Sequence, residues 1–178
     1  MAIEEIVLPE THPETEWLLD APVRKVSPKR RHGRLQLEFG TALGTWARGR
    51  GQVATEWRFR VAPPGEVRRP LVPDIAFVRN DLLRGLDVED AEAPVFAPSV
   101  AVEILSRDDR AVYVDEKIDV LIRAGAELVI VVDPYARRVS LHDANGTGRL
   151  RGNDILTHSA LPDFALSLTE LFAALDLP

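Results

Sequence analysis

Three charged side chains stand within segments of the chain that are otherwise apolar. Asp74 lies in VPDIAFV (72–78), Glu103 lies in SVAVEILS (99–106), and Lys117 follows in a segment with helical spacing. Carboxylate oxygens are the ligands that hard divalent ions such as Mg²⁺ accept in proteins. These residue types therefore indicate a metal-binding pocket with a lysine beside it.

The two acids would lie close together if their strands are neighbours. Alternation along a strand puts Asp74 on one face with Ala76, and Glu103 on one face with Ala101. Burying an ionised carboxylate is costly, and two close carboxylates also repel each other, so a cation must lie between them. A divalent metal ion is one candidate. The alternative is that each acid lies near a strand end and pairs with a surface arginine or lysine.

Lys117 is a candidate because of its place on a helix expected from about residue 109 to 124. Val114, Ile118 and Leu121 mark the buried stripe of this helix, and Lys117 is expected at the edge of the stripe. From an edge position its amine can extend to solvent or reach over the sheet towards the carboxylates. The helical spacing leaves both possibilities open.

Two further residues could belong to such a site. Glu56 lies on a strand expected over 52–61, where it is either an additional acidic ligand or a surface acid. His32 lies near the apolar stripe of a helix expected over 27–48, where it either contacts phosphate or forms a structural hydrogen bond. The surface role for Glu56 and the structural role for His32 are the simpler interpretations.

Strand and helix patterns alternate along the chain. Helical spacing over 27–48 is followed by strand patterns over 52–61 and 71–78, and LVIVV (128–132) is uniformly apolar. A uniformly apolar strand is typical of a sheet that is covered on both faces. We therefore predict an α/β fold with a mixed sheet flanked by helices. The side chains expected to be largely buried are Leu35, Phe39, Trp46, Ile75, Phe77, Val102, Ile104, Ile118, Val129 and Val131.

The 178 residues suit one domain, with 1–27 as an N-terminal arm or edge element and 28–176 as the core. The absence of cysteine excludes disulfides and thiolate metal sites. The N-terminus does not read as a secretory signal, and no apolar run approaches the roughly 18 residues that span a bilayer. We expect a cytoplasmic protein without membrane association.

Positive charge is concentrated in one part of an acidic chain. The net charge is −6, yet residues 21–69 contain twelve lysines and arginines against three acids. Lys29, Arg30, Arg31 and Arg34 could form a patch that attracts phosphate. The alternative is that they are solvated charges on a helix.

The segments around the three charged residues resemble a known family. VPDIAFV, PSVAVEILSRDDR and AGAELVIVVDP, in this order around Lys117, are similar to the Uma-two family of the PD-(D/E)XK nuclease superfamily, over about residues 20–172. The resemblance implies a three-layer restriction-endonuclease-like core and an endonuclease that cuts DNA with Mg²⁺ or Mn²⁺. We also expect a homo-oligomer, a dimer.

The resemblance also implies roles for particular residues. Asp74 matches the proline–aspartate acid of the family and Glu103 its strand glutamate, and both would bind the metal together with the carbonyl of Ile104. The superfamily lysine would stand at Leu105, but the Uma-two pattern takes its lysine from the following helix, at Lys117. The metal would activate a water and polarise the phosphate, while the lysine would orient the water or stabilise the developing charge.

The chain departs from the family pattern at three packing positions. Leu121 stands where the family often has tyrosine, and Val129 and Ile130 stand where it often has an aromatic pair. Because fold does not fix function, a non-catalytic nucleic-acid-binding or protein-interaction module that retains the nuclease fold remains the alternative, and the negative net charge keeps it open. A third possibility is a metal-dependent hydrolase of a smaller phosphate ester.

Overall fold

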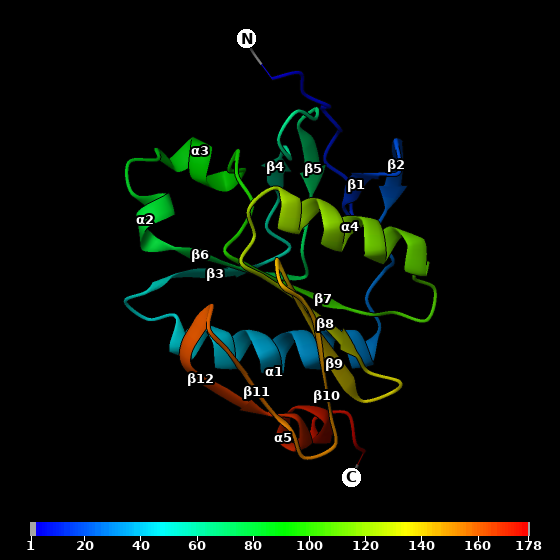
Figure 1. The fold of residues 1–178 in the computed structure, drawn as a ribbon. Coiled ribbons are helices and arrows are strands. Elements are labelled where there is room, and N and C mark those ends of the chain that lie inside the picture. Colours follow the sequence, from blue (N-terminus) through cyan, green and yellow to red (C-terminus); the bar gives the residue numbers. More distant parts are fainter. Residues whose placement is uncertain (1–2, 178) are drawn as a thin grey trace.

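The centre of the computed structural model, which describes residues 3–177, is a six-stranded mixed sheet (Figure 1). Only β7 and β8 run parallel, and the other neighbouring pairs are antiparallel. In spatial order the strands are β10 (Gly146–Arg151), β9 (Arg138–Asp143), β8 (Leu128–Asp133), β7 (Val100–Ile104), β6 (Ile75–Arg79) and β3 (Gly51–Thr55).

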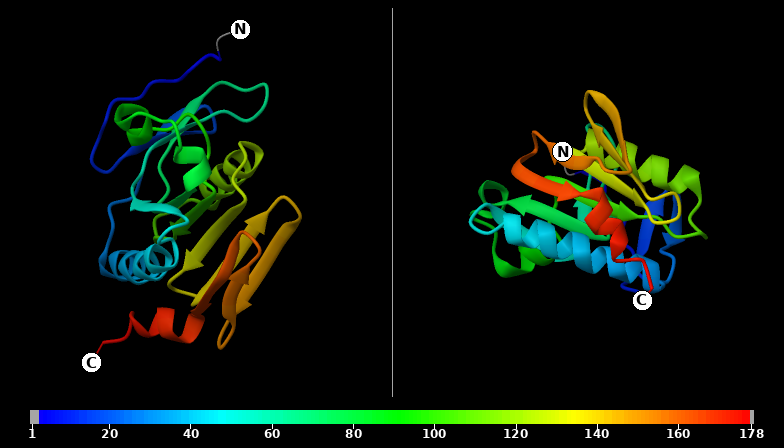
Figure 2. Two further views of the ribbon diagram at one scale, coloured as in Figure 1. Left: turned by 90° about the vertical axis from the view of Figure 1, so that its left-hand side faces the viewer. Right: turned by 90° about the horizontal axis from the view of Figure 1, so that it is seen from below.

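Helices cover both faces of this sheet, as the sequence predicts. α1 (Arg30–Trp46) lies on one face and α4 (Ala111–Arg123) on the other (Figures 1 and 2). Strand alternation sends Ile75 and Phe77 into the core beneath α1, while Ala76 and Val78 join the core beneath α4. α4 connects β7 to β8, because parallel neighbours need a crossover of this length. The fold is thus the predicted α/β/α architecture.

Smaller elements flank the two layers. On the α4 side are two two-stranded sheets, and β1 contacts β5. On the α1 side a third two-stranded sheet leads into α5. These elements are β1 (Thr15–Leu18), β2 (Ala21–Arg24), β4 (Phe59–Val61), β5 (Arg69–Leu71), α2 (Asn80–Leu83), α3 (Val88–Glu92), β11 (Ile155–His158), β12 (Leu161–Ser167) and α5 (Leu168–Ala173).

Two of the strands expected from the sequence are each divided in the structure. The strand expected over 52–61 is interrupted at Glu56, whose φ of 52° lies in the left-handed region and cannot continue an extended strand. The strand expected over 71–78 is interrupted around Pro73, which has no N–H to donate to a ladder. Asp74 consequently lies immediately before β6, not within it.

Eight of the ten side chains expected in the core are buried, and Trp46 and Ile118 are half-buried. Strand β8 is an inner strand between β7 and β9, as its uniform apolar sequence predicts. The position of Ile118 shows that the buried face of α4 is rotated from the expected one. Its buried residues are Lys117, Val120 and Leu121.

Within residues 3–177, no helix has both the length and the apolar character required to cross a bilayer.

Candidate metal-binding and catalytic site

A cavity of about 280 Å³ lies at the end of β7, beside α4, the first turn of α1 and the β1–β2 hairpin. Asp74, Glu103 and Lys117, the three residues that the sequence singles out, all line it. His32, a further candidate, lines it too. The fold therefore brings these four side chains to one place from strand β7, from the residue that precedes β6 and from two helices.

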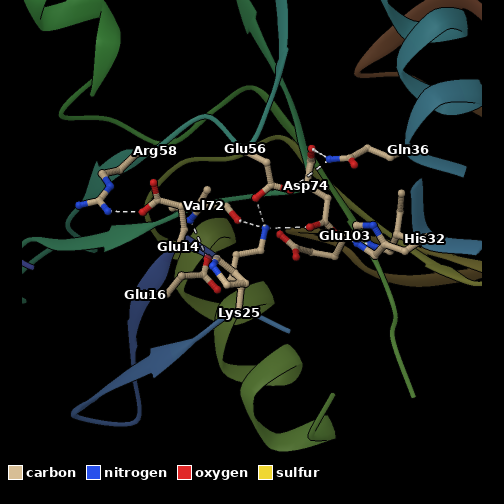
Figure 3. A network of polar contacts seen from close by, with 12 residues as sticks. Glu14, Glu16, Lys25, His32, Gln36, Glu56, Arg58, Val72, Asp74 and Glu103 are labelled. Carbon is tan, nitrogen blue, oxygen red and sulfur yellow. Dashed lines mark hydrogen bonds and ion pairs between the residues drawn. The ribbon is translucent and has the colours of Figure 1, made fainter. Parts of the chain in front are cut away.

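Asp74 is held as an ionised carboxylate by three donors. It is 3% exposed; its Oδ2 accepts a hydrogen bond from the backbone N–H of Ile104 at 2.7 Å and lies 3.1 Å from Nε2 of His32. Its Oδ1 accepts from the amine of Lys25 at 2.8 Å (Figure 3). Burial opposes the charge, but Lys25 and His32 outweigh it and keep the pKa of Asp74 well below its ordinary value.

Lys117 lies at the centre of the buried face of α4, so the expected edge position is wrong. The residue is 4% exposed, and its amine donates a hydrogen bond to the carbonyl of Val72 at 3.0 Å. The same Nζ is 2.6 Å from Oε1 of Glu16 and 2.8 Å from Oε1 of Glu103. Burial opposes the charge, but these two carboxylates keep the pKa of Lys117 above its ordinary value. Its amine is charged and points into the protein interior.

Glu103 is the acid whose hydrogen bonding is incomplete. It is 8% exposed, and although its Oε1 is close to the Lys117 amine, the contact lacks the geometry of a hydrogen bond. Within residues 3–177, this oxygen has no other hydrogen-bond donor. Burial raises the pKa of Glu103 to about 8, despite the neighbouring ammonium group. This oxygen can therefore accept a hydrogen bond or bind a cation in the pocket.

Glu56 is connected to Asp74 through Lys25. The Lys25 amine donates to Oε2 of Glu56 at 2.8 Å and to the carbonyl of Val72 at 2.9 Å, in addition to Asp74 (Figure 3). Gln36 of α1 donates to Oε1 of Glu56 at 3.1 Å and to the backbone carbonyl of Asp74 at 2.9 Å. The left-handed turn at Glu56 thus places this acid beside the site, but its side chain is 43% exposed and is not part of the cavity lining, as the surface alternative predicted.

Two site residues lie in the N-terminal segment, which the sequence suggested only as an arm or edge element. Glu16 of β1 is buried, contacts Lys117, and accepts a hydrogen bond from the N–H of Val72 at 2.6 Å. Lys25 follows β2 directly. Glu16 shares the buried face of β1 with Leu18, which is the same signal that identified Asp74. Lys25 gave no such signal.

These residues form a charge cluster, defined as Glu16, Lys25, Glu56, Asp74, Glu103 and Lys117. Two lysine amines supply the positive charge that the buried acids were expected to need. The cluster nevertheless has twice as many carboxylates as ammonium groups.

The charge cluster fits a hard divalent ion in its donor chemistry. The acids supply only oxygen ligands, they outnumber the lysines, and one oxygen of Glu103 has no well-formed hydrogen bond. In the part of the chain that the structure describes, no three acidic or imidazole side chains are already arranged to hold a metal. An ion would therefore have to draw some of these carboxylates away from their lysine partners.

The four basic residues suggested as a phosphate-attracting patch make separate contacts. Arg31 alone lies over an aromatic ring, that of Tyr135. The other three contact polar groups of the protein itself. The amine of Lys29 lies 3.2 Å from a carboxylate oxygen of Asp108, Arg30 donates to the carbonyl of Leu175, and Arg34 donates to Glu38 and to the carbonyl of Ala174.

The chain is similar to known proteins along almost its full length. The model of the Uma2 family, described as "Putative restriction endonuclease", matches residues 7–174. A crystal structure described as a "putative nuclease belonging to DUF820" from Anabaena variabilis has a TM-score of 0.84, with 23% sequence identity and 94% of each chain covered. No curated protein matches the chain. The structural likeness shows a shared fold, and the family match includes every residue of the charge cluster.

Proposed function

The chain belongs to the Uma2 family of restriction endonuclease-like proteins, and from that membership we propose that it hydrolyses phosphodiester bonds of DNA with a divalent metal ion. The observation that carries this proposal is the meeting of Asp74, Glu103 and Lys117 in one pocket. Two carboxylates can bind a divalent ion, and a charged lysine can stabilise the charge that develops during such hydrolysis.

Asp74 and Glu103 would hold the ion, Mg²⁺ or Mn²⁺, together with the backbone carbonyl of Ile104. All of these donors are oxygens, which suits both ions. When bound, the ion would supply Lewis acidity, polarising the phosphate and lowering the pKa of a bound water.

The remaining residues of the pocket position charge. Lys117 presents a charged amine that can hold an attacking water or a phosphate oxygen by hydrogen bonding, and Glu16 keeps this amine in place. The N–H of Ile104 and the ring of His32 fix the orientation of the Asp74 carboxylate. We assign Lys117 to catalysis, and we assign His32 and Glu16 to positioning. Glu56 is an additional acid that lies beside Asp74.

The wider setting of the activity rests on the family and not on a feature of the pocket. We propose that the whole chain acts as one nuclease-like domain, in the cytoplasm, as a homodimer on DNA. Light scattering of the purified protein would test the dimer directly.

A non-catalytic nucleic-acid-binding or interaction module is the second candidate, and one observation favours it. Both oxygens of Asp74 already have donors from Lys25, Ile104 and His32. A carboxylate satisfied in this way can serve stability alone, because it needs no ion to balance its charge.

Cleavage of labelled DNA would separate the two candidates. We expect the wild-type protein to cut duplex or single-stranded DNA only when Mg²⁺ or Mn²⁺ is added, and Glu103→Gln to lose at least about 100-fold in rate, because the ion loses a ligand. Asp119→Asn, at an exposed site on α4, is the matched control and should cut normally. Retained binding without cleavage under any metal would support the non-catalytic module.

The affinity of the site for Mg²⁺ should rise with pH up to about pH 8, where Glu103 loses its proton. Burial has raised this pKa, so at lower pH the metal must displace a proton before the carboxylate can bind it. With one proton released per ion, the affinity should change by about tenfold per pH unit at most and then level off. Calorimetric titration with Mg²⁺ in buffers of different ionisation heat would measure both the affinity and the proton release. An affinity that does not change with pH would remove Glu103 from the metal site.

A further inference from the structure

Tyr135 has two guanidinium groups over its ring, and they come from distant parts of the chain. It follows β8, is exposed, and has Cζ of Arg31 5.7 Å and Cζ of Arg107 5.0 Å from the centre of its ring. Arg31 is in the first turn of α1, and Arg107 is in the loop between β7 and α4. We name these three residues the Tyr135 clamp.

The positive charges of the clamp are not neutralised. Within residues 3–177, neither Arg31 nor Arg107 has an ion pair or a hydrogen bond to a carboxylate. The nearby acids have other partners: Asp108 pairs with Lys29, and Asp133 pairs with Arg138. The guanidinium N–H groups are therefore available to an anion, while each group is held over the ring.

The clamp stands at the edge of the pocket that contains the charge cluster. Arg31 precedes His32, and Arg107 follows Ser106, and both of these neighbours line the pocket. The loop after β7 and the turn after β8 lie side by side, because these parallel strands end together and the N–H of Leu105 donates to the carbonyl of Val132 at 2.9 Å. A chain of phosphates that has one phosphate in the pocket would pass the clamp with the next.

We propose that the Tyr135 clamp binds phosphates adjacent to the scissile phosphate of a DNA strand. Arg31 and Arg107 each contact one of these phosphates through their N–H groups, and the Tyr135 ring positions both guanidinium groups by cation–π contact. This inference rests on the proposed nuclease function and adds a phosphate-binding subsite to it.

Binding of a labelled single-stranded oligonucleotide with phosphorothioate linkages, which resist hydrolysis, tests the clamp by fluorescence anisotropy in Mg²⁺. Tyr135→Ala should weaken binding by roughly 2- to 5-fold, the range for an exposed cation–π contact, whereas Tyr135→Phe keeps the ring and should bind like wild type. The double variant Arg31→Gln/Arg107→Gln should lower the slope of log affinity against log salt by about 1.4, at roughly 0.7 per phosphate contact on a single strand.

The double variant Arg149→Gln/Arg151→Gln is the matched control. Both arginines are exposed on edge strand β10, so the same charge is removed at a distance from β7 in the sheet. Circular dichroism would confirm that all variants keep the fold. If the clamp variant and the control lose affinity equally, the clamp makes no specific contact, even though the wild type binds and cuts DNA. If the wild type neither binds nor cuts any nucleic acid, the proposed function fails and the clamp proposal fails with it.

Discussion

Replacing Lys117 by methionine should lower the free energy of unfolding of the metal-free protein by about 3–5 kcal/mol. Methionine occupies a similar volume but leaves the buried carboxylates of Glu16 and Glu103 without their shared ammonium group. The loss should be greatest above about pH 8, since below that pH Glu103 can take up a proton and become neutral. Urea denaturation over a range of pH measures the loss, and the same variant should have no detectable cleavage of DNA.

Two further variants make this result specific. Arg123→Met, on the same helix but in an exposed ion pair, should cost less than about 1 kcal/mol. Adding Glu103→Gln to Lys117→Met should recover part of the stability, because it removes one buried unpaired charge. If Lys117→Met is as stable as wild type, the amine does not neutralise these acids, and its assignment to the pocket is wrong.

Replacing Asp74 by asparagine should also destabilise the metal-free protein, by about 3–5 kcal/mol. Repulsion between two buried acids alone would give the opposite sign, but here Lys25 would lose a buried carboxylate partner. The pKa of Asp74 is depressed, so its contribution is present at neutral pH and is lost as acid protonates it. The acid-induced loss of stability should therefore be smaller in Asp74→Asn than in wild type.

The same variant tests the metal site. An ion bound only by the folded protein at a hundredfold excess over its dissociation constant adds about 2.7 kcal/mol of stability. Wild type should therefore melt at a higher temperature in Mg²⁺ or Mn²⁺, and Asp74→Asn should not. The exposed Asp119→Asn should keep the full shift. If wild type shows no shift and Asp74→Asn is destabilised, then Asp74 is structural and the metal-dependent part of the proposal is wrong.

The sheet, its two helical layers, the acid just before β6 and the acid of β7 could be predicted because each leaves a local mark in the sequence. A carboxylate among alternating apolar residues is visible without knowledge of any neighbour, and this identified Asp74 and Glu103. Lys25 leaves no such mark, because its role is set by Asp74, 49 residues along the chain. The strand break at Glu56 could not be predicted either, because nothing in the sequence indicates a positive φ at this residue, which is not a glycine.

The depth of Lys117 in the structure has a different cause. A helical wheel locates the buried face from apolar residues alone, and on α4 these gave a centre near Ile118. The observed face is rotated towards Lys117 because Glu16, Glu103 and the carbonyl of Val72 form a polar receptor for its amine. Those partners lie in β1, in β7 and in the segment between β5 and β6, so the helical wheel contains no information about them.

Lys25 also changes what an affinity measurement on this pocket would mean. Asp74 already has a counterion, the Lys25 ammonium group, at 2.8 Å. A divalent ion that took Asp74 as a ligand would therefore have to displace the Lys25 ammonium group, which would then be left with Glu56 or water as its partner. The measured binding free energy would then be the difference between two ionic interactions, and weak binding would not by itself mean poor ligands. Lys25→Met removes the competing cation, and we expect it to bind Mg²⁺ more tightly than wild type.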